Sequence, residues 1–109
     1  MPGSRVKAVK VSSLRLNIVE MPIFEWDENK EKSNFRKHGI SFTEDESVFY
    51  DLHSLTIPDP DHSIEEHRFI DIGTSNKNRV LVVVYTEREN RIRIISVRKA
   101  SSTERKMYE

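Results

Sequence analysis

The segment RVLVVVYTERENRIRIISVRKA, from Arg79 to Ala100, decides the fold because it holds the longest β-branched apolar runs and the densest arginines in the chain. Residues 80–86 carry apolar side chains on both alternating faces, which predicts a central strand covered on both sides. Residues 91–99 predict a second strand, and the short polar stretch 87–90 predicts a hairpin turn between the two.

The second strand of this hairpin mixes isoleucines with arginines. Strict alternation predicts that Ile92 and Ile94 share one face with Arg98, whereas Arg93 points to the other face together with Val97. The sheet should therefore be hydrophobic, with cations on the strand after the turn.

Helices and further strands are predicted on both sides of the hairpin. Asp27 should cap a helix over 28–38 that Gly39 ends, and Thr43 should begin a second helix in a capping box with Glu46. Strands are predicted over 23–26, 52–57 and 68–72, and a last helix over 103–109. Short links between sequential strands favour antiparallel pairing. We therefore predict an α+β fold, an antiparallel sheet of four to five strands with two N-terminal helices on one face and a short C-terminal helix.

The length of 109 residues predicts a single domain. Residues 1–20 are weakly patterned and are interpreted as an N-terminal extension or tail. The domain itself is predicted to cover 21–109, because Met21 stands directly before the first well-patterned segment.

Composition excludes several classes of protein. The chain has no cysteine, which excludes disulfides, thiol catalysis and thiolate metal sites. No apolar run approaches the roughly 20 residues that span a bilayer, and no secretory signal is apparent. We therefore expect a cytoplasmic protein.

The formal net charge of zero hides a strong polarity along the chain. Residues 41–67 contain eight acids and no lysine or arginine, whereas residues 87–106 contain seven bases and three acids. Such asymmetry is compatible with a surface for a polyanion, and equally with ordinary solvated charge.

Familiar catalytic motifs are missing, including a glycine-rich phosphate loop and a nucleophile elbow. One acidic loop could in principle bind a hard divalent ion, although such loops are usually only solvated. Its candidate ligands are Asp59, Asp61, His62, Glu65, Glu66 and His67. We expect no metal and no other cofactor.

Cations on predicted strands form the more informative set, namely Arg68, Arg93, Arg98 and Lys99. A sheet positions such side chains more firmly than a loop does, and the guanidinium group of arginine binds phosphate oxygens through two parallel hydrogen bonds. The alternative is pairing with surface acids. His38 suits proton transfer near neutral pH, although His38 and Lys37 would also complement a helix C-terminus. Tyr108 and Glu104 could take part in proton transfer or simply pack in a terminal helix.

Several segments together resemble the BrnT family of toxins, and the resemblance runs from Phe24 to Glu109. They are FEWDENK (24–30), NFRKHGISF (34–42), Val48-Phe49, Glu66-x-Arg68-Phe69, Gly73, VVVYTER (82–88), RIRIISVRKAS (91–101) and the closing Glu104-Arg105 with Tyr108. Asp45 departs from the family pattern, which has a small apolar residue there.

The resemblance implies a RelE-like fold and a type II toxin that cleaves RNA without metal and inhibits translation. It also implies a DNA-binding BrnA-like antitoxin with a ribbon-helix-helix fold, through which alone the complex would reach operator DNA. Judged from residue type, Arg68, Arg93 and Arg98 would hold phosphate in such a reaction, and Lys37, His38 and Glu66, with Tyr108 as an outside candidate, would transfer protons. Arg91, Lys99 and Arg105 would bind RNA.

Two alternatives remain open from the sequence. The chain could be a non-catalytic module that binds the antitoxin and serves operon autoregulation. It could instead be a metal-dependent nuclease that uses the loop from Asp59 to His67.

Overall fold

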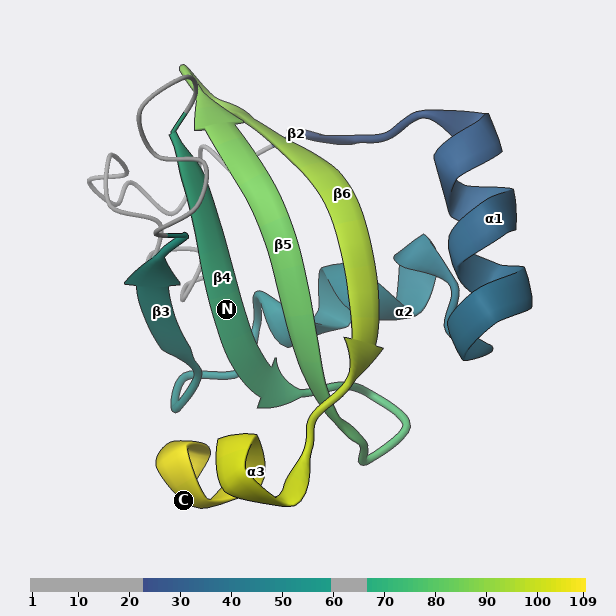
Figure 1. The fold of residues 1–109 in the computed structure, drawn as a ribbon. Coiled ribbons are helices and arrows are strands. Elements are labelled where there is room, and N and C mark those ends of the chain that lie inside the picture. Colours follow the sequence, from purple (N-terminus) through teal and green to yellow (C-terminus); the bar gives the residue numbers. More distant parts are fainter. Residues whose placement is uncertain (1–22, 60–66) are drawn as a thin grey trace.

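The computed structural model describes residues 23–59 and 67–109, and within these ranges five strands form one sheet in the order β2-β6-β5-β4-β3 (Figure 1). The strands are β2 (Ile23–Glu25), β3 (Leu55–Pro58), β4 (Arg68–Thr74), β5 (Val80–Arg88) and β6 (Arg91–Lys99). The helices are α1 (Glu28–His38), α2 (Phe42–Val48) and α3 (Ser102–Tyr108). The predicted α+β class is confirmed. The predicted N-terminal tail, the start at Met21 and the residue Glu66 lie outside the described residues.

Strand β5 is the centre of the sheet, as its apolar sequence predicts. Strands β3 to β6 pair antiparallel in succession, whereas β2 pairs parallel to β6. The sheet is therefore mostly rather than wholly antiparallel. The parallel pair is possible because the long connection through α1 and α2 separates β2 from the other strands, and parallel strands need such a crossover.

A β-bulge interrupts the pairing of β5 with β6. Ser96 pairs with Val84, but the next residue of β5, Tyr85, pairs with Ile94. Ile95 is therefore the extra residue of the bulge, and side-chain alternation on β6 restarts there.

This bulge corrects the predicted facing of the arginines. Ile94 and Val97 are both buried in the same cluster, although strict alternation would separate them. Arg93 pairs with Thr86 and Arg98 pairs with Val82, so both arginines lie on the opposite face of the sheet from that cluster. The prediction that Arg93 and Arg98 point to opposite faces is wrong, because it assumed an uninterrupted strand.

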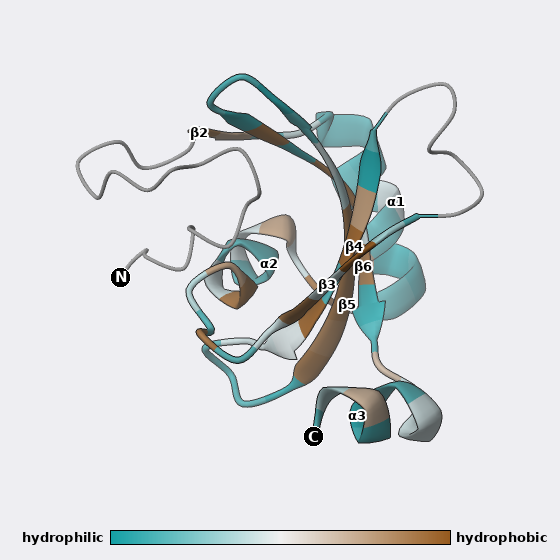
Figure 2. Ribbon diagram, turned by 90° about the vertical axis from the view of Figure 1, so that its left-hand side faces the viewer, coloured by the Kyte–Doolittle hydropathy of each residue, from teal (hydrophilic) through white to brown (hydrophobic). Residues whose placement is uncertain are grey.

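The main core lies between the sheet and α2. The sheet curls around this helix, which covers one face (Figure 2). Phe49 packs its ring 5.3 Å from that of Phe24 and 4.9 Å from that of Tyr85. The fully buried members are Ile40, Phe42, Val48, Phe49, Leu81, Val83, Tyr85, Ile92, Ile94 and Val97. Ser41, rather than the predicted Thr43, caps α2, because its side chain accepts a hydrogen bond from the Glu44 amide.

Helix α1 stands along the edge of β6 instead of sharing the face that α2 covers (Figure 1). Asp27 caps its start and Gly39, with φ of 72°, ends it, as predicted. The Asn34 carboxamide donates to the Val97 carbonyl at 2.9 Å and accepts from the Val97 amide at 3.1 Å. A side chain thus satisfies the backbone groups that a further strand would otherwise pair.

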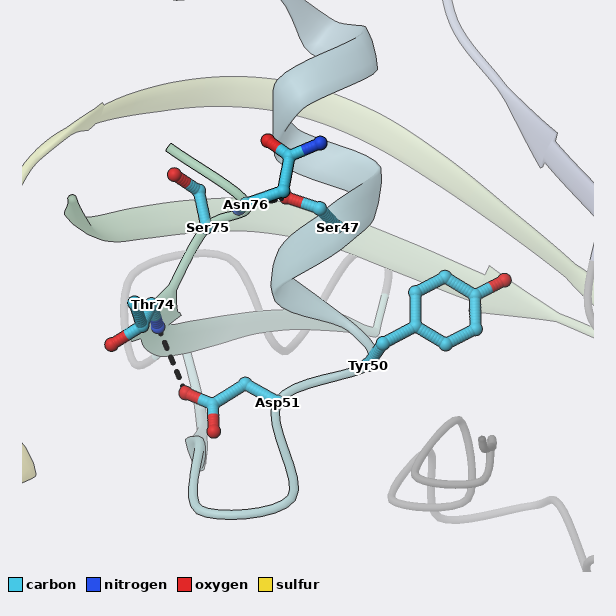
Figure 3. A pocket seen from close by; sticks show the side chains of 6 residues that line it. All are labelled: Ser47, Tyr50, Asp51, Thr74, Ser75 and Asn76. Atoms are coloured by element: carbon cyan, nitrogen blue, oxygen red, sulfur yellow. Dashed lines mark hydrogen bonds between the residues drawn. The ribbon is translucent and has the colours of Figure 1, made fainter. Parts of the chain in front are cut away.

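Helix α3 covers one end of the other face. Ser101 caps it in a capping box with Glu104. Its Tyr108 packs on a second cluster of Ile72, Val82 and Ala100. Next to Tyr108, Asp51 accepts a hydrogen bond from the Thr74 amide at 2.8 Å (Figure 3). This bond connects the segment after α2 to the end of β4.

Candidate functional site

The face of the sheet opposite α2, called the open face below, carries arginines from three strands. Cross-strand register decides this, because residues that pair directly point to the same side. The arginines of the open face are Arg68, Arg88, Arg91, Arg93 and Arg98. Helix α3 covers the end of this face nearest Arg98.

Four paired residues, one from each of four strands, form a row across the open face that contains two arginines and one acid. Arg68 pairs with Thr86 on β5, Thr86 pairs with Arg93 on β6, and Arg93 pairs with Glu25 on β2. Neighbouring strands lie about 4.8 Å apart, so the Cα atoms of Arg68 and Arg93 are roughly 10 Å apart. Their long side chains can therefore reach one phosphate between them.

Glu25 is the acid of this row. Its Oε1 accepts a hydrogen bond from Arg91 Nη1 at 3.1 Å, and its Oε2 lies 3.7 Å from Arg93 Nη1. The side chains are partly exposed, at 36% for Glu25, 53% for Arg91 and 46% for Arg93. All three groups are therefore accessible to a ligand.

Arg98 lies at the far end of the open face and is tied to α3. Its two terminal nitrogens donate to the two oxygens of Glu104, each at 2.8 Å. The hydrogen bond from Arg98 lowers the pKa of Glu104 to about 2. At about 3.3 Å a residue, Arg98 is roughly 15 Å along β6 from Arg93, so the two do not reach the same phosphate.

A hollow of about 340 Å³ between α1 and β6 brings Lys37 and His38 together. The two residues share it with Lys30 and, from β6, with Ser96, which belongs to the open face. The full lining is Lys30, Ser33, Asn34, Lys37, His38, Ile95 and Ser96, and it contains no acid. This α1/β6 hollow therefore adds cations to the border of the arginine-bearing face.

Tyr108 is engaged in holding α3. Its hydroxyl donates to Asp51 Oδ2 at 2.5 Å and lies 2.9 Å from Thr74 Oγ1. Burial, followed by the hydrogen bond to Asp51, raises the pKa of Tyr108. The adjoining hollow of about 360 Å³ is lined by Ser47, Tyr50, Asp51, Thr74, Ser75 and Asn76, none of which is cationic (Figure 3). These contacts favour an anchoring role for Tyr108.

The remaining predicted residues are dispersed. Arg91 belongs to the open face, whereas Lys99 pairs with Leu81 and lies on the opposite side. Arg105 donates a hydrogen bond to the carbonyl of Ala100, just before α3, at 3.3 Å. Glu66 lies outside the described residues. Of the acidic loop only Asp59 and His67 are described, and among residues 23–59 and 67–109 no cluster of three metal-ligating side chains occurs.

Two buried acids lie beneath the sheet on the side of α2. Asp45 is fully buried, and neither of its carboxyl oxygens has a hydrogen-bond partner among residues 23–59 and 67–109. Burial, reinforced by the charge of Asp71, raises the pKa of Asp45 well above its usual range. Asp71 accepts a hydrogen bond from Thr56 Oγ1. Both acids belong to the core and lie away from the open face.

Sequence reasoning missed three residues of the cationic surface, namely Glu25, Lys30 and Arg88. Glu25 reaches the arginines only through the parallel pairing of β2 with β6, which local patterning does not reveal. Lys30 could have been found, because it lies seven residues, about two helical turns, before Lys37. Arg88 pairs with Arg91 across the hairpin, and the sequence of the turn already implies that pair.

The fold and this surface define a class: a small α+β protein whose mostly antiparallel sheet is covered by a helix on one face and carries arginines on the other. Residues 26–104 match the family model described as the ribonuclease toxin BrnT of type II toxin-antitoxin systems. The chain therefore belongs to the BrnT family of ribonuclease toxins, as its sequence motifs predict.

A solved structure agrees with this assignment. The crystal structure of the Brucella abortus ribonuclease toxin BrnT is similar to this chain, with a TM-score of 0.59 and 28% sequence identity. The match covers 75% of this chain and 99% of that one. No curated protein matches the sequence. In the described part of this chain, no helix has the length and apolar character needed to cross a membrane.

Proposed function

We propose that this protein is an endoribonuclease toxin that cleaves RNA by attack of the 2′-hydroxyl on the adjacent phosphate, without a metal ion, and thereby inhibits translation. Family membership supports the ribonuclease activity and the existence of an antitoxin. The observation that carries the mechanism is the row in which Arg68 and Arg93 flank Thr86 on the open face.

The chemistry requires cations near the non-bridging oxygens, because negative charge accumulates there in the transition state. Arg68 and Arg93 lie close enough to bind one phosphate from two sides. Guanidinium groups suit this task since they remain charged and donate two parallel hydrogen bonds. The substrate is RNA because only RNA carries the 2′-hydroxyl that this reaction consumes.

The other candidate residues receive supporting roles in this proposal. Arg98 and Arg91 bind neighbouring phosphates of the same strand, and Lys37 with His38 binds RNA at the α1/β6 hollow. His38 is the proposed acid that protonates the leaving 5′-oxygen. Glu66 remains a proposed proton-transfer group on residue type alone.

The proposed partner is a BrnA-like ribbon-helix-helix antitoxin that covers the open face in the cytoplasm. Such a protein would neutralise the toxin by occupying the arginines with acidic side chains, and it would carry the complex to operator DNA. A non-catalytic module would bind the same partner but leave RNA intact, so cleavage separates the two functions.

The test is cleavage of a defined single-stranded RNA by the purified protein in the presence of a chelator. The wild type should cleave it, leave the corresponding DNA intact, and give a 2′,3′-cyclic phosphate and a 5′-hydroxyl. Arg93→Ala should lower the rate by roughly 10²- to 10³-fold, the effect of losing one oriented donor. Arg36→Ala, an exposed arginine of α1 outside the proposed site, is the matched control. Wild-type rates in Arg93→Ala, or complete loss of activity with chelator, would reject the mechanism.

A further inference from the structure

We propose that Glu25 is the general base of the reaction, an inference that rests on the ribonuclease function proposed above. The group that removes the 2′-proton must lie beside the cations that hold the scissile phosphate. Among the described strand residues of the open face, Glu25 is the carboxylate that meets this requirement.

Register fixes the position of Glu25. It pairs with Arg93 on the neighbouring strand, in the same row as Thr86 and Arg68. Its neighbour Phe24 packs on Phe49 in the main core, so alternation directs Glu25 to the open face. The packing of Phe24 and the pairing of β2 with β6 therefore fix the backbone that carries the Glu25 carboxylate.

The contacts of Glu25 change when a phosphate binds. In the free protein its two oxygens face Arg91 Nη1 at 3.1 Å and Arg93 Nη1 at 3.7 Å. A phosphate bound to these guanidinium groups would compete for the same N–H donors. Binding of RNA would thus release a carboxylate oxygen at the place where the ribose adjoining that phosphate must lie.

The released oxygen can then take the 2′-proton. The bond between O2′ and phosphorus forms while the bond between phosphorus and O5′ breaks. The proton of the 2′-hydroxyl moves to Glu25, and His38 or water supplies a proton to the leaving O5′. The products are a 2′,3′-cyclic phosphate and a 5′-hydroxyl, and the step needs no other reactant.

The other candidate bases occupy different positions. Lys37 and His38 end α1 and line the α1/β6 hollow beside Ser96, whereas Glu25 pairs with Arg93 itself. Glu104, the acid at the far end, is held by both terminal nitrogens of Arg98 and by the Ser101 amide. Glu25 is therefore the acid that shares a row with both proposed phosphate ligands.

The test compares Glu25→Gln with wild type on one RNA oligonucleotide and on its 2′-O-methyl form, which has no 2′-proton to lose. Glutamine keeps the shape of the side chain and an oxygen acceptor for Arg91 but does not act as a base. We expect kcat to fall roughly 10²- to 10⁴-fold, with binding of the 2′-O-methyl oligonucleotide unchanged within threefold. Glu28→Gln, an exposed acid in the first turn of α1, is the matched control and should behave as wild type.

Two outcomes would overturn the inference while leaving the proposed function in place. In the first, Glu25→Gln cleaves RNA at the wild-type rate. In the second, it keeps kcat but raises KM and weakens binding of the 2′-O-methyl oligonucleotide, which would make Glu25 only a positioning residue for the arginines. A wild type that does not cleave RNA would instead reject the proposed function, and this inference with it.

Discussion

Arg98 and Glu104 form a two-pronged ion pair that joins the end of β6 to the first turn of α3, with both hydrogen bonds at 2.8 Å. Glu104 also accepts a hydrogen bond from the Ser101 amide at 2.8 Å, so one carboxylate both completes the capping box and orients Arg98. The pair is partly exposed, at 45% for Arg98 and 24% for Glu104, which limits its contribution through solvent screening.

The first prediction concerns this pair and acid pH. The pKa of Glu104 is lowered from 4.5 to about 2, so its stabilising effect is complete above pH 4.5 and is lost as the pH falls toward 2. Arg98→Gln should lower the free energy of unfolding by about 1 kcal/mol at pH 7. Urea denaturation at several pH values should show this difference shrinking between pH 4.5 and 2. A difference that does not change with pH would contradict the pairing.

The second prediction concerns Asp45, which is fully buried and has no hydrogen-bond partner in the part of the chain that the structure describes. Because burial raises its pKa in the folded state, the folded protein binds the proton more tightly than the unfolded chain does. The contribution of Asp45 to stability is therefore most favourable at acid pH and becomes less favourable as the pH rises above its ordinary pKa of 3.8. Asp45→Ala should raise the free energy of unfolding at pH 7.5 by on the order of 1–3 kcal/mol.

The gain from Asp45→Ala should grow with pH, which thermal denaturation between pH 5 and 8 can measure. Glu46→Ala sets the scale of the effect, because Glu46 is a half-buried acid on the same helix whose pKa burial also raises, so its gain should have the same sign and be smaller. Equal stability of Asp45→Ala and wild type across this range would show that the buried carboxyl has a partner in solution.

The third prediction concerns Gly73 on β4. A Cβ atom there would lie 2.9 Å from Ser54 Cβ and 2.9 Å from Val48 Cγ1, closer than side chains tolerate. Gly73→Ala should therefore destabilise the fold by about 1–3 kcal/mol through overpacking. Gly39→Ala tests backbone strain instead, because φ of Gly39 is 72° while no described atom lies within 4 Å of an added Cβ. This variant should lower the free energy of unfolding by about 1–2 kcal/mol. Chemical denaturation of both variants measures the two effects.

The fourth prediction separates the two roles considered for Tyr108. Tyr108→Phe removes the hydroxyl that contacts Asp51 and Thr74 and should lower the free energy of unfolding by about 1 kcal/mol. If the residue only anchors α3, RNA cleavage by the folded variant equals that of wild type. A loss of about 10²-fold in kcat with intact folding would instead place the hydroxyl in the reaction.

Local signals in the sequence were sufficient for most of the scaffold. The apolar run of β5 predicts its central place, and Asp27 and Gly39 predict both ends of α1, because caps depend on a few neighbouring residues. The start of α2 was predicted two residues late at the cap, since both Ser41 and Thr43 are suitable and packing decides between them.

Long-range relationships were not predictable in the same way. The parallel contact of β2 with β6 brings Glu25 to Arg93 across 68 positions of sequence, and no local pattern encodes that register. The position of α1 beside β6 depends on Asn34, a polar residue that a hydrophobic pattern does not register. The candidate site therefore appeared in the sequence as scattered cations, and only the pairing of strands gathered some of them.

The extra residue Ile95 makes β6 one position longer than the pairing with β5 requires. Removing this single isoleucine would restore a regular pleat and leave the other side chains on their present faces, because Ile94 and Val97 would then lie two positions apart on the core side and Arg93 and Ser96 two positions apart on the other side. Homologous toxins should accordingly accept the loss of this one position with the same side chains still facing the core.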